Sequence, residues 1–327
     1  KAGLENEMIA KNQLILDITT QYFQSLYAKG VERASKVQLD LSEKQLCRIT
    51  RMVETGKEAV SKQYEMQSRA SSDRLNYTVA QNNTSQALTT LKQMLQLEAG
   101  TPFDIIQPDL DTVMITAPDY DTDSIFSIAS GILPRLKAIA FELEAAKKQV
   151  SAAKGFRSPS LEVGGRIYTG YYQRLNEGTP TQDSFTDQLK NNNSQAIYLS
   201  LAVPIFNNYV TGRNVSLAKI RMNDTELKLE LEKNNLYSEV ENACLDFNRG
   251  IDEHAAAIAN LTFNKKSFTA VEKKFESGLV DVTDYSAAQV TLFRAETEAL
   301  RTKLQVMFRK LTIQFITTGD YEYILSN

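Results

Sequence analysis

Apolar side chains recur every three or four residues along most of the chain, the spacing that places them on one face of an α-helix. This pattern predicts helices over about 6–28, 33–97, 123–154 and 211–315. Within the third, a heptad seam typical of coiled-coil packing is formed by Leu136, Ile139, Leu143, Ala146 and Val150. Pro134 interrupts that segment, so a short helix is expected to end near Gly131. From residue 211 to residue 276, the fourth segment would form a helix roughly 100 Å long, which is longer than a compact domain needs.

Two glycines interrupt the long helical segments at matching places. Glu54-Thr55-Gly56 corresponds to Glu276-Ser277-Gly278, and apolar positions on either side also align. A repeat of about 220 residues is too long for a solenoid unit and indicates a duplicated helical hairpin. Either these glycines only break long helices, or they mark the far tips of two hairpins. Their matching positions favour the tips.

Between the third and fourth helices the hydrophobic period changes to two, as in a β-strand. Residues 160–172 and 195–205 both alternate, and about twenty polar residues between them predict a long polar loop. The apolar face of the second strand carries Ile197, Leu199, Leu201 and Val203. An outer-membrane strand needs such an apolar face toward lipid. A soluble hairpin lying on a helical bundle would show the same alternation, so both interpretations remain open from the hairpin alone.

Composition supports a folded, helical protein without catalytic chemistry. The 327 residues include 42% hydrophobic and 24% charged residues, with only 14 glycines and 7 prolines. A net charge of −3 without a basic block disfavours nucleic-acid binding, and no run of 18 apolar residues predicts a transmembrane helix. The single histidine, His254, is expected at the surface, and Cys47 and Cys244 as small buried residues. No catalytic triad, zinc spacing or phosphate loop is present, so we expect no enzyme, no cofactor and no metal site.

Four short motifs occur in an order that resembles the TolC family of outer-membrane efflux proteins. They are Gln21-Tyr22-Phe23, Pro159-Ser160-Leu161, Val203-Pro204-Ile205-Phe206 and Phe275-Glu276-Ser277-Gly278-Leu279-Val280-Asp281-Val282-Thr283-Asp284. No single motif is specific, but the ordered set covers nearly the whole chain. The resemblance implies a mainly α fold with a small β part: very long antiparallel coiled-coil helices that form an α-barrel, and a β-hairpin that contributes to a trimeric transmembrane β-barrel.

The resemblance also implies a function and a division of the chain. We expect a homotrimeric, passive exit duct in the outer membrane of a Gram-negative bacterium, extending into the periplasm and docking a periplasmic adaptor and an inner-membrane pump. The expected segments are 1–100, first-repeat periplasmic helices; 101–124, an irregular equatorial connector; 125–157, a second-repeat helix; 158–207, the outer-membrane hairpin; 208–319, long second-repeat helices; and 320–327, a tail.

One departure from the family pattern concerns the number of strands. The chain has one strand pair and begins, at Lys1, where the family's first hairpin has already ended. Three such chains would supply six strands, too few for a hollow barrel, since about eight strands already fill with side chains. We therefore expect a processed or truncated piece, lacking on the order of 100 residues that form the family's first helix and first hairpin.

At the tips, the resemblance suggests gating residues. Asp284 matches one position of the family's acidic rings, whereas the next ring position falls on Ala287 and the first-copy position on Lys62. The gating candidates are Lys62, Asp281 and Asp284. An ion pair between Lys62 and Asp284 is one hypothesis, and solvated tip charges are the alternative.

The same turns are the expected docking surface for the adaptor. The docking candidates are Gly56, Lys57, Gly278, Leu279 and Val280. A glycine lets another helical hairpin approach closely, and Leu279 and Val280 are expected to be exposed; helix packing within the protomer would explain them equally. The competing function is a soluble periplasmic coiled-coil scaffold or adaptor, which should lack both the alternating strand pair and the duplication.

Overall fold

The computed structural model describes residues 1–98, 100–106, 121–173 and 184–319. The chain divides into two compact units, one formed by 1–138 with 230–327 and the other by 139–229. Most of the predicted connector (107–120) and the predicted tail (320–327) lie outside the described residues, as does part of the polar loop (174–183). Among the described helices, no single one is long and apolar enough to cross a membrane.

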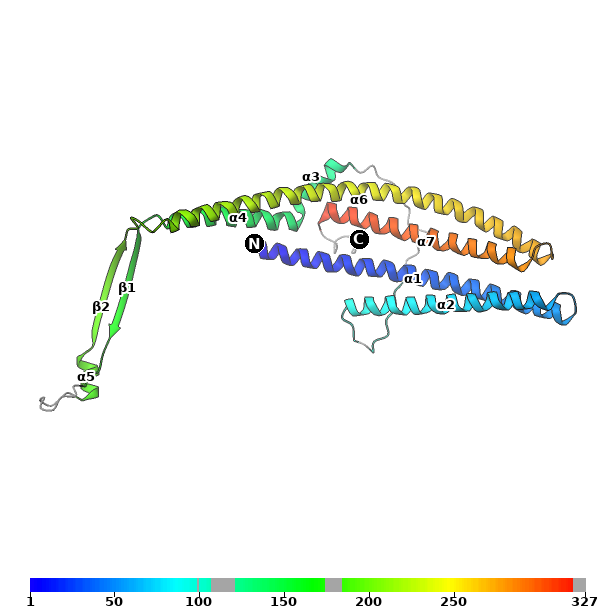
Figure 1. Ribbon diagram of the computed structural model, residues 1–327, viewed down its shortest axis with the longest axis horizontal. Coiled ribbons are helices and arrows are strands. Elements are labelled where there is room, and N and C mark those ends of the chain that lie inside the picture. The colour runs from blue at the N-terminus through cyan, green and yellow to red at the C-terminus, as the bar shows by residue number, and fades with distance from the viewer. Residues whose placement is uncertain (99, 107–120, 174–183, 320–327) are drawn as a thin grey trace. The chain divides into compact units, whose positions relative to one another are not determined.

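The larger unit is built from two long helical hairpins that lie side by side (Figure 1). In the first, α1 (Ala2–Glu54) returns as α2 (Val60–Met94). In the second, the C-terminal part of α6 (Val210–Glu276) returns as α7 (Val282–Thr318). The turns of both hairpins lie at the same end, on the right of Figure 1, next to one shared cluster of buried apolar side chains. The two glycines therefore mark hairpin tips, as their matching positions predicted.

Helix α1 continues through Gly30, so the predicted break between residues 28 and 33 is wrong. The glycine is explained by α7, whose Leu300 side chain would collide with a Cβ atom at Gly30. Gly30 is thus a place where two helices approach closely, which offsets the roughly 1 kcal/mol that glycine costs in a helix. Such a contact partner, far away in the sequence, leaves no local signal.

The third predicted helix is divided as Pro134 indicated. Helix α3 (Thr122–Ile132) ends before Leu133, and α4 (Pro134–Gly155) begins with the proline. Proline fits the first position of a helix because its missing N–H has no partner there. In the smaller unit, the seam residues Leu143, Ala146 and Val150 are buried, in agreement with the heptad pattern.

The smaller unit also contains the strand pair. β1 (Ser160–Tyr168) and β2 (Ser194–Ala202) run antiparallel, with Leu161 opposite Leu201 and Gly165 opposite Ile197. The predicted loop between them is partly wrong, because residues Phe185–Asn191 form a short helix, α5. Ser184 caps this helix by accepting a hydrogen bond from the Asp187 N–H at 3.3 Å, an interaction that stabilises helix starts.

Candidate functional sites at the hairpin tips and the strand pair

Both tips have the same backbone geometry. Gly56 and Gly278 have φ angles of +70° and +72°, in the left-handed region that favours glycine. At the first tip the Lys57 N–H donates to Met52 O at 2.8 Å, and at the second the Leu279 N–H donates to Lys274 O at 2.8 Å. This bond over five residues defines the Schellman motif, a common helix ending. The glycines are therefore required by backbone conformation, and a Cβ at either one would meet nothing within 4 Å.

The helices that leave the two turns start differently. Asp281 caps α7, since its Oδ1 accepts the Asp284 N–H at 2.9 Å. The equivalent residue at the first tip, Ala59, has no side chain that can cap α2. A cap of this kind contributes about 1 kcal/mol. The position of Asp281 thus has a structural explanation beside the gating role predicted for it.

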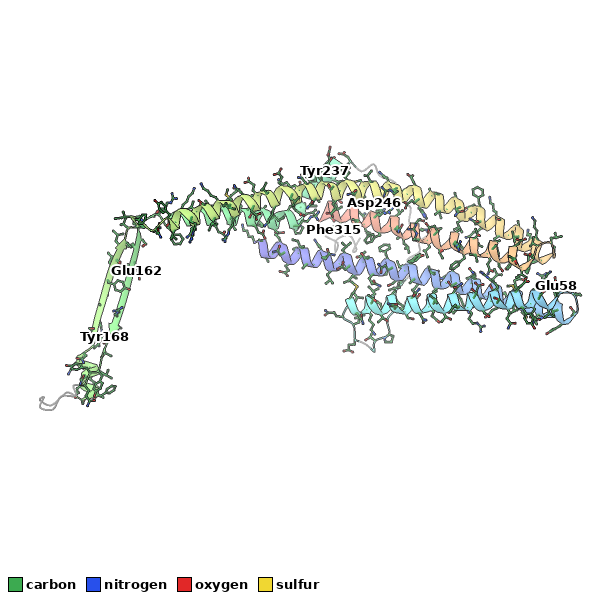
Figure 2. All side chains as sticks on the ribbon, viewed as in Figure 1. Glu58, Glu162, Tyr168, Tyr237, Asp246 and Phe315 are labelled. Atoms are coloured by element: carbon green, nitrogen blue, oxygen red, sulfur yellow. The ribbon has the colours of Figure 1, made fainter. Side chains whose placement is uncertain are left out.

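The charged gating candidates do not meet within the protomer. Lys62 forms an ion pair with Glu58, 2.8 Å from Nζ to Oε2, and Glu58 lies in the first tip turn (Figure 2). The hypothesis of a Lys62–Asp284 pair is therefore wrong for a single chain. Asp284 and Ala287 are exposed on the same side of α7, one turn apart. That face carries one carboxylate where the family pattern predicts two.

The apolar docking candidates differ in exposure. Leu279 is 75% exposed, whereas Val280 is half-buried and packs against the cluster beneath the tips. The expectation that both are exposed is therefore wrong for Val280. Lys57 is exposed beside Gly56. The tip surface thus combines one exposed leucine, one exposed lysine and two left-handed glycine turns.

An aromatic stack joins α6 and α7 beneath the tips and forms part of a buried cluster shared by both hairpins. Tyr285 of α7 is fully buried, with its ring centroid 4.5 Å from that of Phe275 and 5.6 Å from that of Phe268. Burial raises the pKa of the Tyr285 phenol above its ordinary value. Met66 of α2 and Ile49 of α1 complete this cluster, which joins helices of both repeats.

A buried carboxylate next to this stack escaped the sequence analysis. Asp73 of α2 is 1% exposed and accepts a hydrogen bond from Gln38 Nε2 at 2.9 Å and another from the Ser42 hydroxyl. Arg69 forms an ion pair with it at 3.0 Å. Gln289 of α7 donates through Nε2 to Gln38 O at 3.2 Å. The network therefore connects α1, α2 and α7. Its members lie far apart in the sequence, so no local sequence pattern indicates that they meet.

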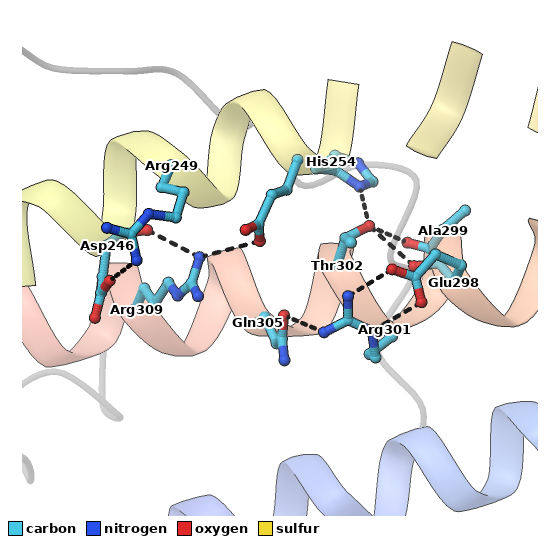
Figure 3. A network of polar contacts seen from close by, with 10 residues as sticks. Asp246, Arg249, His254, Glu298, Ala299, Arg301, Thr302, Gln305 and Arg309 are labelled. Atoms are coloured by element: carbon cyan, nitrogen blue, oxygen red, sulfur yellow. Dashed lines mark hydrogen bonds and ion pairs between the residues drawn. The ribbon is translucent and has the colours of Figure 1, made fainter. Parts of the chain in front are cut away.

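A second polar network joins α6 to α7 (Figure 3). His254 Nδ1 lies 3.0 Å from Thr302 Oγ1, and Arg309 Nη1 donates to Asp246 O at 2.9 Å. His254 is half-buried, so the expectation of a surface residue is wrong, and burial lowers the pKa of its imidazole. Cys244 is buried as predicted, whereas Cys47 is exposed. Among the described residues, no group of three or more His, Cys, Asp or Glu side chains is placed to hold a metal.

The strand pair has one apolar and one mixed face, and both are exposed. The apolar face contains Leu161, Val163, Ile167, Ile197, Leu199 and Leu201, which are 65–89% exposed. Glu162 and Tyr168 lie on the other face of β1 (Figure 2), together with Gly164, over which the Tyr198 ring packs. The alternation predicted from the sequence is therefore present, and no part of the described chain covers the apolar face.

The chain combines a helical hairpin, its repeat, and an inserted strand pair whose apolar face is uncovered. This combination defines a class of membrane-associated helical proteins. Comparison with protein-family models identifies the family: residues 132–317 match the "Outer membrane efflux protein" model. The chain belongs to this family, and it resides in the outer membrane.

Individual relatives agree with this assignment. The outer membrane protein TolC of Escherichia coli (strain K12) is 22% identical over 327 residues; the match covers 96% of this chain and 63% of TolC. Among solved structures, CusC has a TM-score of 0.80 at 16% identity, covering 98% of this chain and 71% of CusC. The Campylobacter jejuni CmeC outer membrane channel has a TM-score of 0.77 at 15% identity, covering 99% and 68%. These similarities confirm the predicted fold class.

Proposed function

We propose that the full-length protein is a passive, homotrimeric exit duct that catalyses nothing and that requires no cofactor. The observation that carries this proposal is the strand pair, whose apolar face is exposed in a chain of an outer-membrane efflux family. Six large apolar side chains exposed to water would be a strong aggregation hazard. In lipid the same face is favourable, at about 25 cal/mol for each Å² of apolar surface removed from water.

In this proposal Ile197, Leu199, Leu201 and Val203 face lipid, and Tyr198 and Ser200 face the lumen. Residues 197, 199 and 201 share the apolar face of β2 in the observed register, and Val203 follows the strand and is 56% exposed. The Ala202-Val203-Pro204 segment then leads toward α6. Because the described chain leaves this apolar face exposed, a membrane-inserted hairpin is favoured over one that lies on a helical bundle.

The tips are proposed to dock a periplasmic adaptor and an inner-membrane pump, which open the duct. Exposed Leu279 and Lys57, flanked by the Gly56 and Gly278 turns, support such a surface. Gating is assigned to Lys62, Asp281 and Asp284, of which only Asp284 is both exposed and free of a capping or ion-pair role for its side chain. Val280 is proposed to support the docking turn from within, since it packs on the buried cluster.

The test is the mass of the full-length protein after extraction from outer membranes in mild detergent. The duct predicts a detergent-dependent trimer. A water-soluble monomer or dimer would exclude the duct and favour a periplasmic coiled-coil scaffold or adaptor. A matched variant with Leu199→Asp and Leu201→Asp should remain helical but lose membrane association, whereas Tyr198→Asp and Ser200→Asp on the opposite face should retain it.

A further inference from the structure

Positive charge is concentrated in the smaller unit where the helices meet the strands. The stretches 145–159 and 203–223 contain seven lysines and arginines and no aspartate or glutamate, in a chain of net charge −3. We call these seven residues the basic collar. They are Lys147, Lys148, Lys154, Arg157, Arg213, Lys219 and Arg221. All seven are exposed, so this charge faces the surroundings of the unit.

The collar is almost free of internal ion pairs. Within the described part of the chain, Lys147 is the one member that forms an ion pair, with Glu144 at 2.9 Å, and Lys148 is attracted to the same carboxylate. Elsewhere in the same unit, outside the collar, Lys228 pairs with Asp224 at 2.7 Å in the common i,i+4 arrangement. Charges that the chain leaves unpaired repel one another, and a negatively charged partner relieves that repulsion.

Apolar and aromatic side chains adjoin the collar on the side of the strands. Phe156, Phe206 and Tyr209 are 72%, 74% and 79% exposed, and Ile205 is 95% exposed. Together with Arg157 they line a groove of about 270 Å³. Aromatic residues at the end of an outer-membrane strand are typical of the level where lipid tails meet headgroups. A cation at this level lies beside phosphate, not beside lipid tails.

Simple lengths place the collar at headgroup depth. The polar layer on one side of a bilayer is about 5–8 Å thick. Lys154 precedes the end of α4 by one residue and Arg213 is in the first turn of α6, so with Arg157 they fall within this layer. At 1.5 Å per residue, Lys148 and Arg221 lie roughly 10 and 17 Å from the strand-side ends of their helices. Lys148 is therefore within one further Debye length of this layer, about 8 Å in physiological salt, whereas Arg221 lies about 9–12 Å beyond the layer and contributes less.

We propose that the basic collar binds the phosphates of anionic phospholipids in the leaflet next to the helix–strand junction. Arg157 contacts a headgroup phosphate while Phe156 and Phe206 lie against the adjacent acyl chain. The inference rests on the proposed function, because it requires the strand pair to be inserted in the membrane. It adds a lipid preference that the apolar face alone would not produce.

The experiment uses the full-length protein reconstituted in phosphatidylcholine vesicles. The relative association constants of spin-labelled phosphatidylglycerol and spin-labelled phosphatidylcholine are measured at about 0.1 M and 1 M salt. The collar variant is Lys154→Gln, Arg157→Gln and Arg213→Gln. The control, Lys44→Gln, Lys57→Gln and Lys274→Gln, removes the same charge from exposed lysines of the larger unit that have no ion pair in the described structure.

Phosphatidylglycerol should be favoured severalfold by the unmodified protein and by the control. The collar variant should lose this preference, because it removes three cations that each contribute about fivefold near a membrane surface. High salt should abolish it, and the charge-preserving variant Lys154→Arg, Arg157→Lys and Arg213→Lys should retain it. If the collar variant does not reconstitute, the salt series on the unmodified protein decides, and a preference that persists at 1 M salt overturns the proposal.

Three other results would overturn the inference in distinguishable ways. If the unmodified protein inserts but shows no preference for phosphatidylglycerol, the collar proposal is wrong and the proposed duct function is unaffected. If carbonate extracts the unmodified protein from the vesicles, both the collar proposal and the proposed duct function are wrong. Collar-dependent co-sedimentation with purified sacculi, without lipid preference, would assign these residues to the anionic cell-wall polymer.

Discussion

Replacing Gly278 with alanine removes the residue that lets the second hairpin turn at its tip. Its φ of +72° lies in the left-handed region, where an L-residue with a Cβ is strained by about 1–2 kcal/mol. A Cβ at this position would meet nothing within 4 Å, so backbone strain is the only local cost. We therefore expect the free energy of opening the tip to fall by about 1–2 kcal/mol, with helix packing elsewhere unchanged.

Amide hydrogen exchange of the full-length protein measures this opening directly. The protection of the Leu279 N–H, which donates to Lys274 O at 2.8 Å, should fall roughly five- to thirtyfold. Gly278→Asn should lose much less, because asparagine tolerates the left-handed region. Gly212→Ala is the matched control: Gly212 is helical and its Cβ would also meet nothing within 4 Å. If Gly278→Ala and Gly212→Ala change tip protection equally, the left-handed turn does not hold the tip.

Three further predictions concern the side chains of Asp281, Asp73 and His254. Asp281→Ala should cost about 1 kcal/mol and raise exchange in the first turn of α7; unchanged exchange would contradict its capping role. Asp73→Ala should lower the free energy of unfolding by about 3–5 kcal/mol in denaturant experiments, because it leaves the Arg69 charge buried and unpaired. The double variant Asp73→Leu with Arg69→Met should recover most of this stability. A loss below about 1 kcal/mol in Asp73→Ala would refute the network. Because burial lowers the folded-state pKa of His254, its stability contribution is complete above about pH 6.5 and is lost as pH falls through the lowered pKa. His254→Gln should therefore reduce the drop in Tm between pH 7 and pH 5, and an unchanged drop would count against it.

The features that could be predicted from the sequence depend on short-range rules. A left-handed turn demands glycine, and this rule together with the matching positions of Gly56 and Gly278 in the repeat made the two tips predictable. The alternation of residues 195–203 likewise follows from the two-residue period of one strand. Pro134 marks the boundary between α3 and α4 because proline cannot donate the hydrogen bond that a helix interior needs.

The features that the sequence did not reveal depend on contacts between distant segments. Gly30 resembles a helix break until Leu300 is seen to occupy the space beside it. Asp73 resembles any exposed helix charge, yet it is buried because Gln38 and Ser42 of another helix supply hydrogen bonds. Val280 follows exposed Leu279 and differs from it only because the chain turns it toward the buried cluster.

Single-channel recording tests the central claim, that the full-length protein is an outer-membrane exit duct, most directly. Purified full-length protein added to a planar lipid bilayer should produce discrete current steps of uniform size. Leu199→Asp with Leu201→Asp should abolish them by preventing insertion, while Ser200→Asp, on the proposed lumen face, should leave insertion intact and change ion selectivity toward cations. The exit-duct function would be contradicted if protein is recovered in the bilayer but produces no current steps at any applied voltage, even with tip variants such as Asp284→Ala.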